Sequence, residues 1–342
     1  MKTDTNDIDK HHLAQVLSEQ YSLELTTFTF LPRGEDAYTY SASSQDGQFY
    51  FIRAQPPSRD RALEQPYVAT HVLHTRYGMT QVVAPYPNRQ QVFTTNYNGY
   101  AVAVFPFIEG RTLYSQGASN SDIEGAAHLL ANVHEASDLL DAAPLKTETF
   151  ENPFKSPILR ALERAGEYIP DENSYRREAG KLLMAEYADV LATLERMEQA
   201  KRQVPLLTTE WVLTHGDPNL DNFLKDVAGV LHLADWGEIA IGPAERDLVA
   251  FSGEQFEVFL SYYIKSRSRK HINLHADIFK FYLYRWAMQE IADYSTRILL
   301  QNMGPQEDEH AWKELQDYLP IRHHDIEREV QELQTTVQRI LG

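Results

Sequence analysis

The first hundred residues carry hydrophobic patterns of two different periods. Near the start, apolar residues recur at roughly helical spacing, which predicts an amphipathic helix: Ile8, Leu13, Val16, Leu17 and Tyr21. Alternating, aromatic-rich runs then predict strands at 25–31, 37–43 and 48–53, the last two separated by an Asp-Gly turn. A helix is expected at 63–77, followed by strands near 82–84, 91–95 and 100–106. This part of the chain therefore predicts a small sheet with few helices.

Beyond Gly110 the hydrophobic pattern changes to long helical periods. These predict helices at 121–140, 157–168, 174–201, 254–264, 276–300 and 308–341. One β-hairpin is expected among them, with arms at 222–226 and 230–235. The simplest organisation is an α+β chain of two lobes, a small antiparallel-sheet lobe over 1–108 and a larger, mainly helical lobe over 109–342.

Composition narrows the class of protein. The 342 residues include 32 Lys and Arg against 49 Asp and Glu, a formal net charge of −17, and no cysteine. A chain this acidic repels nucleic acid and anionic membranes and attracts cations. No apolar run reaches the length of a membrane span, and the polar start MKTDTNDIDKHH does not have the pattern of a secretory signal. We therefore expect a cytoplasmic protein whose partners include neither nucleic acid nor membrane.

Candidate chemistry is concentrated in the segment VLTHGDPNLDNFLKDVAGVLHLADWGE, residues 212–238. Asn222 lies five residues after Asp217, and the returning hairpin arm brings Asp235 beside Asn222. An amide oxygen and a carboxylate presented together suit Mg²⁺, while Asp217 can take a proton from a substrate hydroxyl. His215 is expected to orient the loop by hydrogen bonding. A polar turn is the alternative for any one spacing, but the whole set favours phosphoryl transfer.

This segment resembles the signature H-x-D-x-x-x-x-N, followed by a metal-binding aspartate, of the aminoglycoside phosphotransferase and choline kinase superfamily. The resemblance runs over most of the chain. Within the superfamily, ADWGE…GPAERDLVAF (234–251) and YRWAMQEIADYSTRIL (284–299) are most similar to the spectinomycin-type aminoglycoside phosphotransferases. Asn219 and Asp221 depart from the pattern, because relatives often carry His and Gly there.

The resemblance implies a bilobal protein-kinase-like fold and a role for each matching residue. Asp217 corresponds to the catalytic base, and Asn222 and Asp235 correspond to the metal ligands. Asp247 corresponds to the aspartate that braces the catalytic loop. The cofactor is then Mg²⁺, and ATP or GTP is the phosphate donor.

The amino-terminal lobe is expected to bind the nucleotide. Arg53 ends the third predicted strand, on the same face as its aromatic neighbours, and corresponds to the cation that anchors phosphate. Glu64, at the start of the next helix, is its candidate partner, with a surface glutamate as the alternative. The loop PRGEDAYTY and the strand AVAVFPFIEG correspond to the nucleotide loop and the adenine-binding hinge, and they add five candidates: Gly34, Glu35, Asp36, Phe105 and Phe107.

The acceptor is expected to be a cationic small molecule. Glu290 and Asp293 share one face of a predicted helix that the resemblance puts near the acceptor cleft, although a solvated acidic face has the same spacing. We expect an aminoglycoside or aminocyclitol antibiotic as acceptor, an activity that confers antibiotic resistance. A metabolic kinase for choline, an amino sugar or a similar amino alcohol is one alternative, and a catalytically weak kinase-like binding protein is another. The apolar repeat over 326–340 is too short for a long coiled coil, which favours a monomer or weak homodimer.

Overall fold

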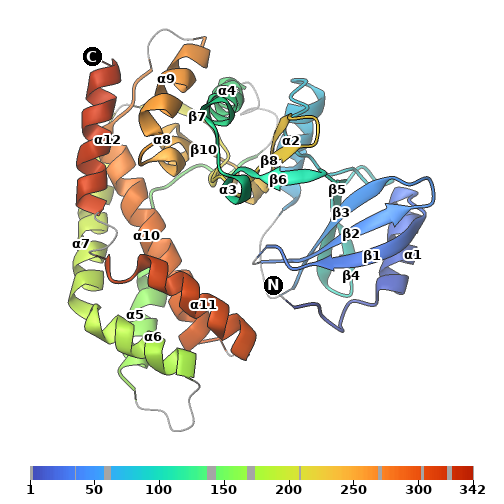
Figure 1. Cartoon of the computed structure of the whole chain (residues 1–342), viewed down its shortest axis with the longest axis horizontal. Helices are drawn as coiled ribbons and strands as arrows, with labels where there is room; N and C mark the ends of the chain where they lie inside the picture. The colour runs from blue at the N-terminus through green and yellow to red at the C-terminus, as the bar shows by residue number, and fades with distance from the viewer. Residues whose placement is uncertain are drawn as a thin grey trace. The chain divides into compact units, whose positions relative to one another are not determined.

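The computed structural model describes residues 3–34, 36–57, 63–136, 144–167, 174–207, 209–268, 272–301, 304–321 and 326–341. Their contacts divide the chain into two compact units (Figure 1). The first unit comprises Met1–Thr147, Val212–Gly242 and Val258–Ser268, and the second comprises Glu148–Trp211, Pro243–Glu257 and Arg269–Gly342. The lobe boundary expected at residue 108 stays a prediction.

A five-stranded antiparallel sheet forms the amino-terminal part of the first unit (Figure 1). Its order is β1-β2-β3-β5-β4, with β1 at Leu25–Leu31, β2 at Tyr38–Ser44, β3 at Phe49–Gln55, β4 at Thr95–Tyr97 and β5 at Tyr100–Pro106. Side chains alternate between the faces of a sheet, and the cross-strand row Tyr40, Ile52 and Val104 is fully buried. Helix α1, at Lys10–Tyr21, contributes Leu13 and Leu17 to this core.

The segment after helix α2, at Glu64–Thr75, connects this sheet to the predicted hairpin. Val82 forms an isolated parallel bridge with Leu233. The Leu233 N–H donates to the Gln81 carbonyl at 2.8 Å, and the Val83 N–H donates to the Leu233 carbonyl at 2.9 Å. The strand expected near 82–84 is therefore only a bridge, but it ties the hairpin to the amino-terminal part of the unit.

The rest of the first unit consists of short strands and three helices. One sheet has the order β6-β8-β9, with β6 at Gly110–Thr112, β8 at Phe223–Asp226 and β9 at Leu231–Leu233. Gly110 is required in β6, because a Cβ there would lie 2.2 Å from the Lys225 carbonyl oxygen. The other elements are β7 (Trp211–Thr214) paired with β10 (Ala240–Pro243), the helices α3 (Leu113–Gln116), α4 (Asn120–Glu135) and α9 (Phe256–Ser266), and the 3₁₀ turn η3 (Trp236–Glu238).

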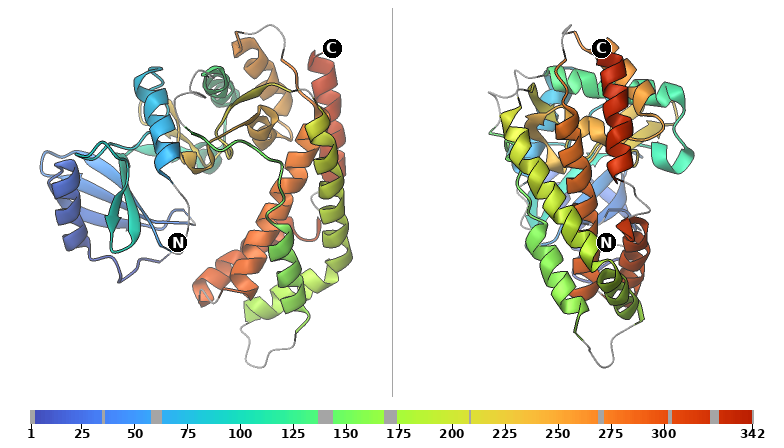
Figure 2. Two further views of the ribbon diagram at one scale, coloured as in Figure 1. Left: turned by 180° about the vertical axis from the view of Figure 1, so that it is seen from behind. Right: turned by 90° about the vertical axis from the view of Figure 1, so that its left-hand side faces the viewer.

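The second unit is helical, and its longest helix is α10, at Ala276–Leu299 (Figure 2). This helix is buried along most of its length and packs most extensively against four other helices. The helices around it are α5 (Lys155–Ala165), α7 (Tyr187–Gln203), α11 (Pro305–Tyr318) and α12 (Ile326–Leu341). The remaining elements are α6 (Ser174–Ala185), η2 (Val204–Leu206), α8 (Glu245–Leu248) and η4 (Val249–Phe251).

The fold class expected from the sequence is confirmed, with differences at particular elements. Two long predicted helices are each two helices: 174–201 is divided into α6 and α7, and 308–341 into α11 and α12. Pro320 lies between the second pair and lacks the N–H that a continuous helix needs. The strand expected at 91–95 begins only at Thr95. None of the described helices has the length and apolarity needed to cross a membrane.

Candidate active site

The candidate catalytic loop lies between β7 and β8 of the first unit. The Thr214 hydroxyl at the end of β7 donates to the Ala240 carbonyl at 2.9 Å and fixes where the loop begins. Gly216 follows with a φ of 97°, a left-handed backbone conformation that glycine adopts without strain. At the other end, the Ala234 N–H donates to the Asn222 carbonyl at 2.9 Å. This bond extends the hairpin and brings Asp235 beside the end of the loop.

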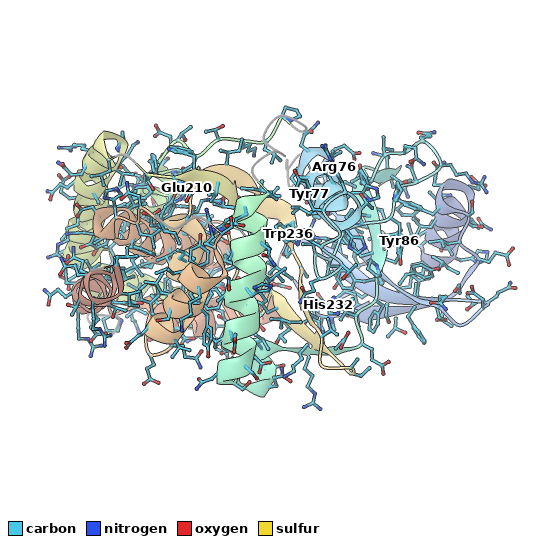
Figure 3. All side chains as sticks on the ribbon, turned by 90° about the horizontal axis from the view of Figure 1, so that it is seen from above. Arg76, Tyr77, Tyr86, Glu210, His232 and Trp236 are labelled. Carbon is cyan, nitrogen blue, oxygen red and sulfur yellow. The ribbon has the colours of Figure 1, made fainter. Side chains whose placement is uncertain are left out.

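His215 connects the two ends of this segment through its buried ring. Nε2 lies 2.9 Å from the Ala234 carbonyl oxygen, and the Asp217 N–H donates to Nδ1 at 3.2 Å. The ring hydrogen is therefore on Nε2. The ring also packs edge-on against Trp236, with centroids 4.5 Å apart, and Trp236 is labelled in Figure 3. These are the contacts of a residue that orients Asp217 and the turn before Asp235.

Asp217 holds its carboxylate between two side-chain amides. Asn219 Nδ2 donates to Oδ1 at 2.9 Å, and Asn222 Nδ2 donates to Oδ2 at 3.2 Å and to the Asp217 carbonyl at 2.7 Å. Asp217 is exposed on the surface of the unit. Partial loss of water around the carboxylate, and then the negative charge of Asp235, raise the pKa of Asp217 above its usual value, although His215 and the two amide hydrogen bonds oppose the shift.

Asn222 and Asp235 offer oxygen atoms that fit a magnesium ion. Because the Asn222 amide nitrogen is bound to Asp217, the group left for a ligand is its oxygen. Asp235 is exposed, in a left-handed conformation with φ of 57°, and its carboxylate accepts no hydrogen bond within the described part of the chain. In that same part, no three His, Asp or Glu side chains gather into a complete metal site. Mg²⁺ usually takes one or two protein ligands and completes its shell with phosphate and water.

Arg53 is held on the sheet by two buried side chains. Its Nη1 donates to Gln55 Oε1 at 3.2 Å, along the same face of β3, and lies 3.5 Å from the Tyr67 hydroxyl on α2. Burial alone would lower the pKa of Arg53, but Tyr67, Asp235 and Asp36 raise it above its ordinary value. The guanidinium is therefore a permanent cation, and Asp235 contributes to the field around it.

The expected ion pair between Arg53 and Glu64 is wrong. The Glu64 carboxylate instead accepts from the Phe93 N–H, at 3.0 and 3.3 Å, and from the Thr94 hydroxyl at 3.2 Å. Glu64 occupies the first turn of α2, and it is turned toward the segment that precedes β4. Tyr67, one turn further along the same helix, reaches Arg53 in its place.

The expected nucleotide-binding segments lie on the five-stranded sheet. Gly34, with a φ of 83°, and Asp36 belong to the turn between β1 and β2, and Glu35 lies outside the described residues. Phe105 is opposite Phe51 in the pairing of β3 with β5. The Phe107 N–H, the expected adenine donor, points back to the Phe49 carbonyl at a long 3.4 Å. Nucleotide binding by these segments stays a prediction.

Three further candidates belong to the second unit. Asp247 is fully buried on α8, and its bracing role stays a prediction. On α10, Glu290 is half-buried, whereas Asp293 is exposed and forms an ion pair with Arg297 at 3.1 Å. The exposed Trp286 lies one helical turn before Glu290, with its ring 5.3 Å from that of Tyr318.

Sequence reasoning missed three residues that contact the candidate catalytic groups, and a fourth that anchors the loop. Gln55 and Tyr67 bind Arg53. The sequence carries a signal for both: Gln55 lies two residues after Arg53, on the same face of the strand, and Tyr67 lies one helical turn after Glu64. Asn219 was noted only as a departure from the family pattern, yet it binds Asp217. Asp221, another such departure, accepts a hydrogen bond from the Thr112 hydroxyl at 3.0 Å and anchors the loop to β6.

The first unit thus holds a carboxylate at Asp217, an amide and a second carboxylate at Asn222 and Asp235, and a half-buried cation at Arg53. Phosphoryl transfer uses groups of these kinds. Residues 27–267 match the phosphotransferase enzyme family (APH). Protein StrN of Streptomyces griseus is 30% identical over 313 residues, which span 87% of this chain and 88% of StrN. The chain belongs to the phosphotransferase enzyme family.

Solved structures share the fold at low sequence identity. The spectinomycin phosphotransferase APH(9)-Ia, in complex with ADP and spectinomycin, has a TM-score of 0.74 at 18% identity, over 91% of this chain and 94% of its own. The amicoumacin kinase hAmiN, in complex with AMP-PNP, Ca²⁺ and Ami, has a TM-score of 0.59 at 15% identity, with coverages of 92% and 95%. The choline kinase LicA from Streptococcus pneumoniae has a TM-score of 0.54 at 19% identity, with coverages of 90% and 99%. The fold is therefore kinase-like.

Proposed function

We propose that this phosphotransferase moves the γ-phosphate of ATP or GTP to a hydroxyl of a cationic small molecule, with an aminoglycoside or aminocyclitol antibiotic as the favoured acceptor. The observation that carries the proposal is the joint presence of Asp217, Asn222 and Asp235 in one hydrogen-bonded loop and hairpin. A turn that served only as a structural cap would not need an exposed carboxylate in a left-handed conformation at residue 235. The complexes of APH(9)-Ia with ADP and of hAmiN with AMP-PNP support a nucleotide as donor.

In the proposed reaction each group has one task. Asp217 accepts the proton of the substrate hydroxyl while the oxygen of that hydroxyl attacks the γ-phosphorus. The bond from that phosphorus to the nucleoside diphosphate breaks. Arg53 binds phosphate oxygens, for which a planar guanidinium is suited. Asn222 and Asp235 would hold Mg²⁺, which would supply positive charge for the phosphate oxygens. His215 keeps the Asp217 backbone in place.

The proposed cation preference rests on α10 and on net charge. Glu290 is half-buried, so its carboxylate is less screened by water than a surface group and binds an ammonium more strongly. The long-range field of a chain with a formal charge of −17 also favours a cation.

A kinase for choline or another amino alcohol is the second candidate, because one specific observation favours it. The exposed ring of Trp286, edge-on to Tyr318 and one turn from Glu290, offers an aromatic surface beside a carboxylate. Quaternary ammonium groups bind to such surfaces through cation–π attraction.

A phosphorylation screen tests the proposal and separates the candidates. The purified full chain is incubated with Mg²⁺ and ATP or GTP against aminoglycosides, spectinomycin, amino sugars and choline, and phosphorylated products are identified by mass spectrometry. Transfer to an antibiotic supports the first candidate, and transfer to choline alone supports the second. Nucleotide binding without transfer to any acceptor would reject both in favour of a binding protein.

Variants of the loop test the roles within the same assay. Asp217→Asn should keep Mg²⁺-dependent nucleotide binding while lowering kcat by about 10²-fold or more, the scale of general-base assistance. Asp235→Ala should make nucleotide binding insensitive to Mg²⁺. Asp226→Asn is the matched control, because Asp226 lies on the same hairpin and binds only local partners, including His232 at 2.9 Å. Near-normal turnover of Asp217→Asn would reject Asp217 as the base.

A further inference from the structure

Asn219 lies at the centre of the candidate catalytic loop, and its side chain contacts both ends of that loop. Its amide nitrogen Nδ2 donates to Asp217 Oδ1 at 2.9 Å. Its amide oxygen accepts from the Asp221 N–H at 2.9 Å and from the Asn222 N–H at 3.2 Å. A single planar amide therefore joins the proposed base to the backbone of a proposed metal ligand.

We propose that Asn219 is a positioning residue, which holds the Asp217 carboxylate in the orientation that accepts the substrate proton. This inference rests on the proposed function of the loop. Each oxygen of Asp217 has one amide donor, Asn219 on Oδ1 and Asn222 on Oδ2, and these two bonds fix the rotation of the carboxylate. A carboxylate accepts about four hydrogen bonds, so lone pairs remain on both oxygens for a substrate hydroxyl. Both donors are uncharged, so neither forms an ion pair with Asp217.

The simpler interpretation is that Asn219 only forms the turn. An Asx turn needs a side-chain oxygen that accepts a backbone N–H, and Asp forms it as well as Asn. The nitrogen of Asn219 has no part in that turn, and it is the atom that binds Asp217. Aspartate at residue 219 would put a second carboxylate against the first, so the contact with Asp217 explains why an amide suits this position.

Three substitutions separate positioning from turn formation. Asn219→Asp keeps the oxygen that binds the Asp221 and Asn222 amides but removes the donor to Asp217. Asn219→Ala removes the donor without adding a charge. Asp221→Ala is the control for general loosening, because it removes the hydrogen bond from Thr112 and leaves the contacts of Asp217 intact. All three are compared with the parent in the full chain, with Tm as a check on folding.

Steady-state kinetics with both substrates varied give the first readout. Asn219→Asp and Asn219→Ala should each lower kcat by roughly ten- to a hundred-fold, the scale of misplaced catalytic groups, with both KM values within about two-fold of the parent. Asp221→Ala should keep kcat within about three-fold of the parent, because a lost surface hydrogen bond changes little. An unchanged kcat in Asn219→Asp, or an equal loss in Asp221→Ala, would overturn the proposal.

A spectroscopic readout keeps the inference separate from the proposed function. The side-chain amide signals of Asn219 in ¹⁵N spectra should move when Asp217→Ala removes their acceptor, and should stay in place in Asp226→Asn. If the parent transferred no phosphate, the proposed function would fail. Displaced Asn219 signals would then still support the contact, whereas unmoved signals would reject it whatever the activity.

Discussion

Glu245, on α8, is a carboxyl group enclosed by the second unit, with no exposed surface. It accepts from the His275 N–H at 2.6 Å and from the Thr209 hydroxyl at 3.4 Å. These bonds do not offset the loss of water, because burial, and then the nearby charge of Glu210, raise the pKa of Glu245 to about 7. Its usual value is 4.5. The folded protein therefore retains a proton that the unfolded chain releases at weakly acidic pH.

This difference in pKa predicts how stability depends on pH. Between pH 4.5 and about 7 the unfolded chain binds fewer protons at this group than the folded protein, so the free energy of unfolding falls as pH rises. Above about pH 7 the loss of unfolding free energy caused by Glu245 is complete, and below pH 4.5 there is no such loss. Glu245→Gln cannot ionise, so its stability relative to the parent should rise by about 2 kcal/mol between pH 5 and pH 8.

Urea unfolding of parent and variant at the two pH values measures this change. Glu163→Gln, which replaces an exposed glutamate on α5, is the control and should show no comparable change. A constant difference between parent and Glu245→Gln across this range would mean that Glu245 is ionised in the folded protein at pH 5.

Fixed spacing along the chain predicts which single residues lie near one another, while the roles of these residues stay predictions. Asp217, Asn222 and Asp235 could be named because the loop and hairpin hold them at fixed distances along the chain. The partner of Arg53 could not be named from the sequence, because Glu64 and Tyr67 both project from α2. Only packing decides which of the two contacts Arg53. The amide of Asn219 was missed for a similar reason, since turn-forming residues are common in loops and their side-chain contacts are not visible in a pattern.

At the scale of elements, hydrophobic periodicity predicts whether a segment is a helix or a strand better than it predicts where that element begins and ends. The strands β1, β2, β3 and β5 lie within a residue or two of the predicted runs, because alternation stops where the turns begin. The break between α6 and α7 at Glu186 carries no proline or glycine, so the apolar period continues through it without a signal. On the two sides of the break, α6 packs against α5 and α10, and α7 packs against α10.

Helix α10 supplies a prediction about acceptor recognition. Glu290→Gln should raise the KM of a cationic acceptor roughly ten-fold or more, because a charge-assisted hydrogen bond contributes about 1.5–3 kcal/mol and each decade corresponds to ~1.4 kcal/mol. The KM of the nucleotide should stay nearly constant. Asp293→Asn is the matched variant and should have a smaller effect, because that carboxylate is exposed and more strongly screened by water.

Initial rates with both substrates varied distinguish these outcomes. If neither variant changes the acceptor KM, recognition of the ammonium must lie with other acidic groups of the helical part. A larger effect of Asp293→Asn than of Glu290→Gln would reverse the assignment along the helix.

At the scale of the whole molecule, the formal charge of −17 acts on both substrates with opposite sign. It attracts a cationic acceptor and repels a nucleotide, which stays anionic with Mg²⁺ bound. The local cation Arg53 opposes the repulsion of the nucleotide, so the net field should affect the acceptor more. The Debye length falls from about 30 Å at 0.01 M salt to about 10 Å at 0.1 M, so only short-range attraction survives at the higher concentration.

We therefore expect the acceptor KM to rise roughly two- to five-fold between about 10 and 200 mM NaCl, while the nucleotide KM falls or stays constant. Sucrose at matched osmolality is the control, because it changes water activity without screening charge. The rise should be smaller for Glu290→Gln, since that variant has already lost a local attraction, although the long-range component should remain. If salt raised both KM values equally, or if sucrose reproduced the effect, the total charge of the chain would have no part in substrate capture and the acidic composition would serve solubility alone.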